Sequence, residues 1–276
     1  MPQANLLPPE PPWLPELLAT LSEHEYLAVH QLGALLRRPA ESLQPVLDRL
    51  AHDRQVRVLS GTTGSTAYAL ALRGARLLAE LTGDEVVPIG RARSAAMLDH
   101  ELTKNDLAVV LQLLDARGSI KLLRWETARD ALADAVHLMR RAQGERVALV
   151  ADALAVIATP AGPTALLVEI DMGTVSLARM RTKYEGYAAW WRGGGPTRRF
   201  GIKSLRLLTI AKHEVRMARL RAAAAEAVGS DAHGFLWFAT TDVLDVDAPE
   251  KMLAAQFHTA TPTDASAPYR PLFGGS

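Results

Sequence analysis

The sequence predicts an α/β protein with two domains, and three observations carry this prediction. Residues up to about 83 read as short helices followed by two alternating apolar runs, the pattern of a β-hairpin. Residues 84–97 contain proline, glycine and charges with little periodicity, which is typical of a linker. Later apolar runs alternate with amphipathic segments, which favours a partly parallel sheet with helical crossovers. We therefore expect domains at 1–83 and 98–260, with a flexible tail at 261–276.

Composition indicates a globular chain that can bury sizeable cores. It has 276 residues, of which 49% are hydrophobic. The absence of cysteine excludes disulfides, thiolate metal sites and cysteine nucleophiles. No apolar run reaches the roughly 18 residues of a membrane helix, and the proline-rich start lacks the pattern of a signal peptide. We expect a cytoplasmic protein without a membrane partner.

The first domain is predicted as three helices, a hairpin and a fourth helix. Residues 14–36 place apolar side chains three and four apart, enough for two short helices with a break near Ser22 and His24. Pro39 then precedes a third, amphipathic helix. The hairpin turns at Gly-Thr-Thr-Gly, residues 61–64, where glycine can take positive φ. This order is typical of a winged helix-turn-helix, whose third helix can enter a major groove.

Basic side chains are concentrated around that third helix and the hairpin, which makes them candidates for DNA contacts. Several polar residues of the helix lie at helical spacing and can reach base edges. The alternative is a winged helix used for protein contacts or dimerisation. The residues expected to bind DNA in this domain are Arg37, Arg38, Gln44, Arg49, His52, Arg54 and Arg57.

The second domain is predicted as α-β-β-β-α-β-α-β. Its first helix begins at His100, and a helical or irregular insert follows the first strand. The predicted strands are 119–127, 147–162, 163–173, 202–211 and 234–241, and the helices between the later ones are 175–192 and 214–228.

Two carboxylates, Glu169 and Asp171, end a predicted strand and point to the same face, because strand side chains alternate. Asp152 opens the preceding strand, so its carboxylate lies at the same end if the two strands form a hairpin. Three crowded carboxylates favour a hard divalent ion such as Mg²⁺. Lys183, on the following helix, can point back and neutralise phosphate charge or hold the attacking water.

The candidate catalytic group is therefore Asp152, Glu169, Asp171 and Lys183, with the three carboxylates as metal ligands. The alternative is that Glu169 and Asp171 finish the strand and cap the next helix, whose positive end favours acids.

A basic tract surrounds Lys183 in the sequence. Between Arg179 and Arg221 there are twelve lysines and arginines against two glutamates, although the net charge of the whole chain is only +1. A local basic face attracts phosphate backbones; the alternative is a solvated helix face. Within the tract, Arg198, Arg199 and Lys203 are candidates for DNA binding.

The second domain resembles the PD-(D/E)XK nuclease superfamily, which implies an α-β-β-β-α-β core. That superfamily has an acid opening the second strand and an acid-x-lysine motif on the third; here the positions hold Ala151-Asp152 and Glu169-Ile170-Asp171. Asp171 stands where the superfamily has lysine, so the basic role passes to Lys183 or is absent along with cleavage. A further acid that members often carry in the first helix falls on Glu101 or Asp106.

Over residues 15–240 the chain resembles the plasmid replication-relaxation family. The resemblance implies DNA binding in the replication, relaxation or mobilisation of plasmids and other mobile elements. It leaves open whether the protein cuts DNA with Mg²⁺ or is a non-catalytic assembly factor or transcriptional regulator that recruits a relaxase or replication initiator. The oligomeric state is also open, a homodimer being one alternative. The motifs that carry the resemblance, besides the winged helix, are His100-Glu101-Leu102, Asn105-Asp106, Trp125-Glu126, Asp152-Ala153, Glu169 to Thr174, and Lys183-Tyr184 with Tyr187.

Overall fold

The computed structural model describes residues 10–62, 64–84, 94–127, 137–140 and 146–261. These residues form two compact units, Met1–Asn105 and Asp106–Ser276. The division falls inside one long helix, α5 (Ala95–Ala116). Most of the predicted linker and nearly all of the predicted tail lie outside the described residues.

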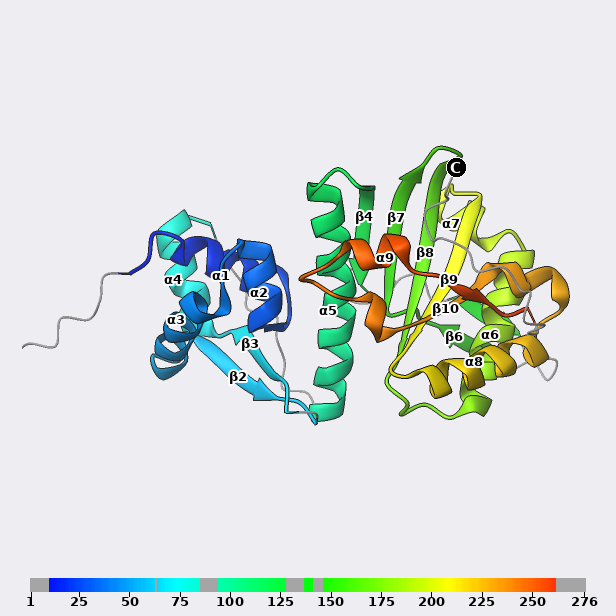
Figure 1. The fold of residues 1–276 in the computed structure, drawn as a ribbon, viewed down its shortest axis with the longest axis horizontal. Coiled ribbons are helices and arrows are strands. Elements are labelled where there is room, and N and C mark those ends of the chain that lie inside the picture. Colours follow the sequence, from blue (N-terminus) through cyan, green and yellow to red (C-terminus); the bar gives the residue numbers. More distant parts are fainter. Residues whose placement is uncertain (1–9, 63, 85–93, 128–136, 141–145, 262–276) are drawn as a thin grey trace, which may run out of the picture. The chain divides into compact units, whose positions relative to one another are not determined.

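The N-terminal unit contains the predicted helices and hairpin (Figure 1). A two-residue strand joins the hairpin, giving a three-stranded antiparallel sheet in the order β1-β3-β2. The elements are α1 (Leu14–Glu23), β1 (Leu27–Ala28), α2 (Val29–Leu36), α3 (Ala40–His52), β2 (Val56–Ser60), β3 (Thr66–Leu70) and α4 (Leu72–Thr82).

Strand β3 contributes to two apolar clusters because its side chains alternate between the faces of the sheet. Tyr68 and Leu70 pack with leucines of the four helices. Ala67 and Ala69 lie on the other face, in a cluster with Leu98 of α5. The small alanine side chains leave room for α5 to approach the sheet closely. The first turns of α5 therefore belong to the N-terminal unit.

The second unit is built on a six-stranded sheet in the order β11-β10-β9-β8-β7-β4. Strands β4, β7 and β8 pair antiparallel, whereas β8, β9 and β10 run parallel, which confirms the predicted crossovers late in the chain. The strands are β4 (Lys121–Thr127), β7 (Ala153–Thr159), β8 (Gly162–Asp171), β9 (Ser204–Ala211), β10 (Leu236–Thr240) and β11 (His258–Thr259), and the larger helices are α6 (Leu177–Arg192) and α8 (Glu214–Ala227).

One predicted strand divides in two. The run expected to be continuous from 147 breaks before Ala153, so that β6 (Arg146–Leu149) pairs with β5 (His137–Arg140) in a separate two-stranded sheet. The segment that forms β5 was expected to be helical or irregular. The segment forms a strand because it hydrogen-bonds to β6. In the sequence, a short apolar run does not distinguish a strand from a helix.

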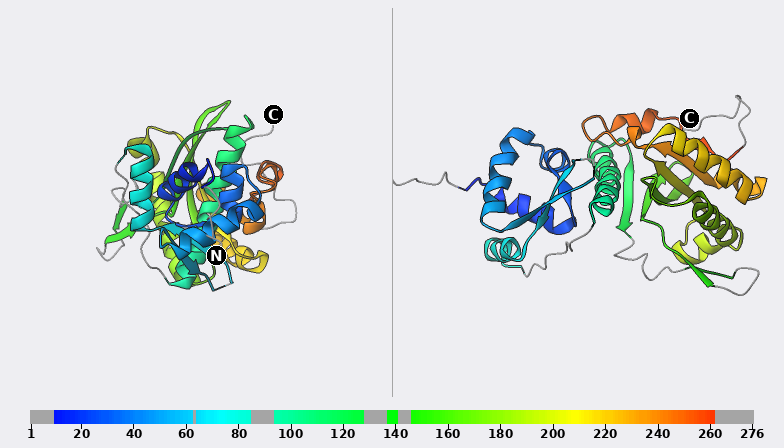
Figure 2. Two further views of the ribbon diagram at one scale, coloured as in Figure 1. Left: turned by 90° about the vertical axis from the view of Figure 1, so that its left-hand side faces the viewer. Right: turned by 90° about the horizontal axis from the view of Figure 1, so that it is seen from below.

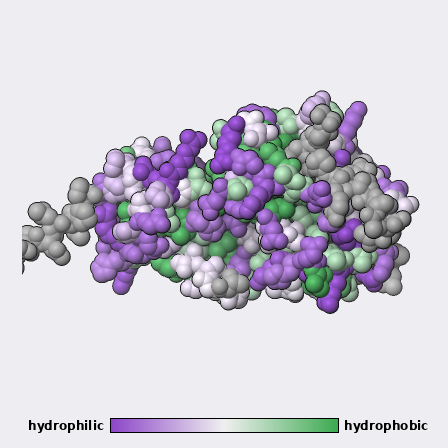
Figure 3. Space-filling model, in the orientation of Figure 1, coloured by the Kyte–Doolittle hydropathy of each residue, from purple (hydrophilic) through white to green (hydrophobic). Residues whose placement is uncertain are grey.

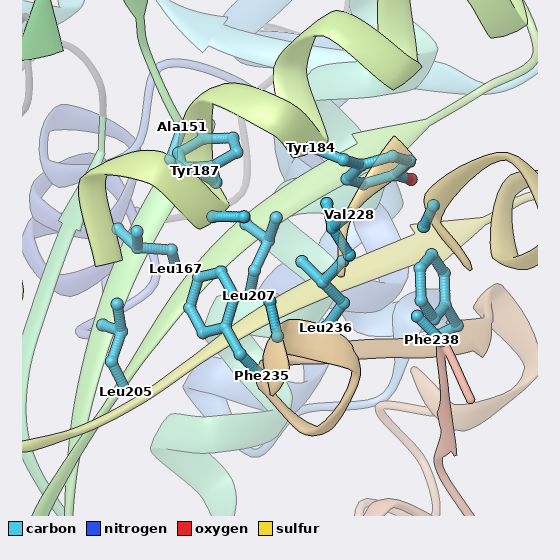
Figure 4. Packing of buried hydrophobic residues seen from close by; sticks show 14 of the residues in the cluster. Ala151, Leu167, Tyr184, Tyr187, Leu205, Leu207, Val228, Phe235, Leu236 and Phe238 are labelled. Atoms are coloured by element: carbon cyan, nitrogen blue, oxygen red, sulfur yellow. The ribbon is translucent and has the colours of Figure 1, made fainter. Parts of the chain in front are cut away.

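Helices α6 and α8 cover one face of the six-stranded sheet (Figure 2). Tyr184 and Tyr187 of α6 lie over Leu167 of β8 and Leu207 of β9 (Figure 4). The Tyr184 ring also meets Phe238 edge to face, at 5.9 Å between centroids. Residues 165 and 167 of β8 face these helices, so the alternation of the strand places residues 169 and 171 beneath them as well.

The surface of the N-terminal unit is hydrophilic over α3 and α4 in the view of Figure 3. Within the described part of the chain, no helix combines the length and the hydropathy needed to cross a membrane.

Candidate functional site

Glu169 and Asp171 are buried carboxylates at the end of β8, with only 3% and 2% of their surfaces exposed. They lie beneath α6 and α8 because they continue the apolar stripe of β8 that those helices cover. An ionised carboxylate is costly to bury unless it is paired and hydrogen-bonded. The hydrogen-bond and ion-pair partners of Glu169 and Asp171 therefore determine whether either carboxylate is available for metal binding or catalysis.

Glu169 is held by two side chains from α6. The Lys183 ammonium lies 2.5 Å from Oε2, and the Tyr187 hydroxyl donates to Oε1 at 2.6 Å. Lys183 and Tyr187 are four residues apart and so share one face of the helix. Lys183 thus points back over the strand end, as the sequence predicted.

Asp152 stands next to Glu169 at the start of β7. Its Oδ2 accepts a hydrogen bond from the Ile170 amide at 2.7 Å, and its own amide donates to the Val168 carbonyl at 2.9 Å. Burial raises the pKa of Glu169 to about 7, with the negative charge of Asp152 acting in the same direction. Lys183 and the Tyr187 hydroxyl favour the ionised form but do not outweigh these effects.

Asp171 belongs to a different pair. Arg216, in the first turns of α8, donates to both of its carboxylate oxygens at 2.8 Å, and the Gly173 amide donates to Oδ1 at 2.8 Å. Arg216 also donates to the Val175 carbonyl at 2.5 Å, so it ties the turn after β8 to the strand end. The hydrogen bond to Asp171 raises the pKa of Arg216.

The four predicted catalytic residues therefore separate into two groups. Asp152, Glu169 and Lys183 come together, with Tyr187 as an additional member. Asp171 instead binds Arg216. The predicted alternative had two parts. Glu169 and Asp171 do finish β8, but neither of them is the N-cap of α6, because the side chain of Ser176 has that role.

Tyr187 and Arg216 were not predicted as site residues. Tyr187 reads as part of an apolar stripe, and it is indeed buried, but its hydroxyl serves Glu169. Arg216 is 45 residues from Asp171. A signal did exist: a helix that follows a parallel strand begins near the carboxyl end of the neighbouring strand, so an arginine in its first turns can reach an acid there.

The described side chains contain no group of three or more His, Asp or Glu arranged to hold a metal ion. Both oxygens of Asp171 accept from a guanidinium, whose positive charge opposes a cation at that position. Both oxygens of Glu169 also have donors. As arranged, Asp171 does not fit a Mg²⁺ site, and Asp152 with Glu169 fits one only if Lys183 moves away.

Of the two acids that the nuclease resemblance offers in the first helix, Glu101 or Asp106, Glu101 has a partner inside the N-terminal unit. Glu101 pairs with Lys104 on the same helix. Burial opposes ionisation of Glu101, but His100, whose Nδ1 lies 3.7 Å from Oε1, and the charge of Lys104 outweigh it and lower the pKa of Glu101 to about 2.

Two of the arginines predicted to bind DNA have an unusual backbone. Arg37, the C-cap of α2, has φ 52°, and Arg54, just after α3, has φ 58°; both side chains are exposed. His52 is exposed, while Arg38, Arg49 and Arg57 are half-buried.

Gln44 is less available than the sequence suggests. Its amide nitrogen donates to the Asp48 carboxylate and to the Tyr68 hydroxyl, each at 2.8 Å. Any base contact by Gln44 must use its carbonyl oxygen or break these bonds.

In the second unit, Arg198 and Arg199 of α7 (Gly195–Phe200) and the nearby Lys203 are exposed. Part of the surrounding basic tract is paired with acids that lie outside it in the sequence, as Lys183 is with Glu169 and Arg216 with Asp171. Arg192 forms two hydrogen bonds to Asp231, at 2.7 and 2.8 Å. The excess of positive charge is thus smaller than the count of residues suggests.

Comparison with known proteins gives one match. The family model for replication-relaxation proteins matches residues 18–204. The comparisons with curated proteins and with solved structures give no match. The matched residues include Asp152, Glu169 and Lys183 but end before Arg216. Because the match covers more than half of the sequence, the chain belongs to the replication-relaxation family, which implies a DNA-related role and confirms the resemblance of its motifs.

Proposed function

We propose that this protein binds DNA during the replication or relaxation of plasmids or other mobile elements. In this proposal the N-terminal unit is a winged helix-turn-helix, with α3 as the recognition helix and the β2–β3 hairpin as the wing. The order of its elements supports this assignment, as does the family to which the chain belongs.

The observation that carries the proposal is the pair of exposed arginines at the ends of α3. Left-handed backbone costs a non-glycine residue roughly 1 kcal/mol, and glycine or asparagine is usual after a helix. Arg37 and Arg54 therefore bear a backbone penalty, and such strain is concentrated at functional sites. Helix α3 is 13 residues long, or about 20 Å. Charges at its two ends can reach phosphates on both sides of a major groove about 12 Å wide.

The test replaces Arg37 and Arg54 with glycine, singly and together, and measures duplex binding by fluorescence anisotropy at several salt concentrations. Each lost phosphate contact reduces the slope of log K against log salt by about 0.9. The same substitutions relieve backbone strain, so the variants are expected to remain at least as stable as the parent. The matched control is Arg76→Ala on the exposed face of α4. Unchanged affinity and slope in the double variant would refute the proposal.

A second candidate function is hydrolysis of a DNA phosphodiester by the second unit, as a PD-(D/E)XK-like domain. It is favoured by the meeting of Asp152, Glu169 and Lys183, and a raised carboxyl pKa is common at functional sites. In this proposal Asp152 and Glu169 are the Mg²⁺ ligands, Lys183 faces the phosphate, and Asp171 has a structural role. Mg²⁺-dependent nicking of plasmid DNA that disappears in Asp152→Ala and Lys183→Met would support it. If both variants nick plasmid DNA as fast as the parent protein, this site is excluded.

A third candidate is a non-catalytic assembly factor or transcriptional regulator that recruits a relaxase or replication initiator. Two observations favour it. The oxygens of both buried carboxylates of β8 already have protein donors. The four described tyrosines are at most 3% exposed, so none of them can attack a DNA strand without rearrangement. Capture of a relaxase by the purified protein in the absence of DNA would support this function, and measuring the mass of the free protein would test for a homodimer.

A further inference from the structure

The tip of the β2–β3 hairpin is bound by a carboxylate from α5. The Thr62 amide donates to Asp99 Oδ2 at 2.9 Å, and the Ser65 hydroxyl donates to Oδ1 at 2.7 Å. The Thr62 hydroxyl also donates to Oδ2. Asp99 is only 6% exposed. Three donors from one turn therefore converge on a single buried anionic group.

The contact between Asp99 and the hairpin tip requires a glycine at position 61. The φ of Gly61 is not in the left-handed region, so the backbone itself does not require glycine there. A Cβ at this position would lie 1.9 Å from Asp99 Oδ1 and 2.2 Å from Ser65 Oγ. Glycine is thus needed because the carboxylate and the hydroxyl come so close.

Two further polar contacts hold the first turns of α5 to the N-terminal unit. The fully buried Gln31 amide donates to the Leu102 carbonyl at 2.8 Å, and Asn105 donates to the Tyr26 carbonyl at 2.5 Å. The apolar cluster beneath this part of α5 is small and includes three alanines. The polar contacts of Asp99, Gln31 and Asn105 thus add to a small apolar contact, and Asp99 engages the hairpin tip.

The donors at the tip are those that bind DNA backbones. Backbone amides and the hydroxyls of Ser and Thr make many of the protein contacts to phosphate oxygens, and a carboxylate presents similar acceptor atoms. The hairpin is the wing of the proposed winged helix, which is the element placed to contact DNA beside the recognition helix. In the free protein these donors are satisfied by Asp99.

We propose that Thr62 and Ser65 form a phosphate-binding site at the wing tip, and that Asp99 fills it in the free protein as an internal substitute for DNA phosphate. DNA and α5 then compete for the same donors, so that binding of duplex by the wing releases the start of α5. This inference rests on the proposed DNA-binding function.

The test compares duplex affinity of the full chain by fluorescence anisotropy in two variants that open the site differently. Asp99→Ala removes the carboxylate, and Asp99→Asn removes its charge while keeping the size of the side chain. Both are expected to bind more tightly, by about tenfold, within the range typical of coupled binding events. In the Asp99→Ala background, Thr62→Val with Ser65→Ala is expected to lower the affinity toward the parental level, because both hydroxyl donors are lost and the Thr62 amide remains.

Glu80→Gln, on the exposed face of α4, is the control for the loss of one negative charge in the same unit. Circular dichroism checks that each variant is folded, and Asp99→Asn carries the test alone if Asp99→Ala is not folded. If the parent does not bind duplex, the proposed function fails. If the parent binds but the folded Asp99 variants bind no more tightly than Glu80→Gln, only the competition between α5 and DNA is refuted.

Discussion

Replacing Arg216 with methionine is expected to destabilise the second unit by about 3–5 kcal/mol. Asp171 is 2% exposed, and Arg216 provides two of the three hydrogen bonds recorded for its carboxylate. Hydrogen bonds to charged groups contribute about 1.5–3 kcal/mol each, and removal of one partner from a buried ion pair costs about 3–5 kcal/mol. The two estimates agree because the loss leaves a buried charge with the Gly173 amide as its remaining recorded donor.

Urea unfolding followed by tryptophan fluorescence provides the measurement. Trp13 is the tryptophan of the N-terminal unit, so a Trp13→Phe background makes the signal report on the second unit alone. With a urea m-value of about 2–3 kcal/mol/M, Arg216→Met lowers the midpoint by about 1–2.5 M. The emission then comes from Trp125, Trp190, Trp191 and Trp237.

A double-mutant cycle separates the pair from its surroundings. Adding Asp171→Asn to Arg216→Met removes the uncompensated charge, so the double variant is expected to be more stable than Arg216→Met alone. A cost below about 1 kcal/mol for Arg216→Met would refute the reasoning, since that is the strength of a solvent-screened surface pair.

Three other predictions concern pH, salt and the extent of the N-terminal unit. Because the pKa of Glu169 is raised from 4.5 to about 7, the folded state binds the extra proton between these values, and stability falls as pH rises through this window; Glu169→Gln is expected to flatten the change in urea midpoint between pH 4.5 and 8. Arg198→Ala with Arg199→Ala is expected to reduce the slope of log K against log salt for duplex binding by about 2. An unchanged slope would mean that these two arginines do not contact the DNA backbone. A fragment of residues 10–84 is expected to melt at least about 10 °C below one of residues 10–106, by circular dichroism, because it lacks the α5 contacts of Gln31 and Asn105; equal melting would show that α5 adds nothing.

Much of the fold follows from periodicity. The hairpin with its Gly-Thr-Thr-Gly turn, the leucine pattern of α3 and the late alternation of strands and helices are local signals, and the corresponding elements form where they were predicted. The approach of Lys183 to the end of β8 also follows from its position on the next helix. Local pattern therefore sufficed for most of the longer elements and for the approach of Lys183 to Glu169, but not for β1 or the β5–β6 sheet.

The rest of the candidate site depends on contacts that a local pattern does not specify. Apolar spacing predicts that Tyr187 is buried but says nothing about the partner of its hydroxyl. To predict that Asp171 pairs with Arg216, one must know which strands are neighbours in the sheet. Without the strand order, nothing distinguishes Asp171 from Asp152 and Glu169 as a candidate metal ligand. Similarly, α5 looks like the start of a second domain until Ala67 and Ala69 are seen to pack against it.

The pairing of Asp171 with Arg216 also bears on how the protein is made. On the ribosome Asp171 emerges 45 residues before its partner, and the family match ends before that partner is reached. Until α8 has left the exit tunnel, the Asp171 carboxylate has no arginine partner, so burying it costs free energy. The helical cover of the sheet also stays incomplete. Nascent chains that stop short of residue 216 lack this partner and are thus expected to be targets of chaperones and proteases.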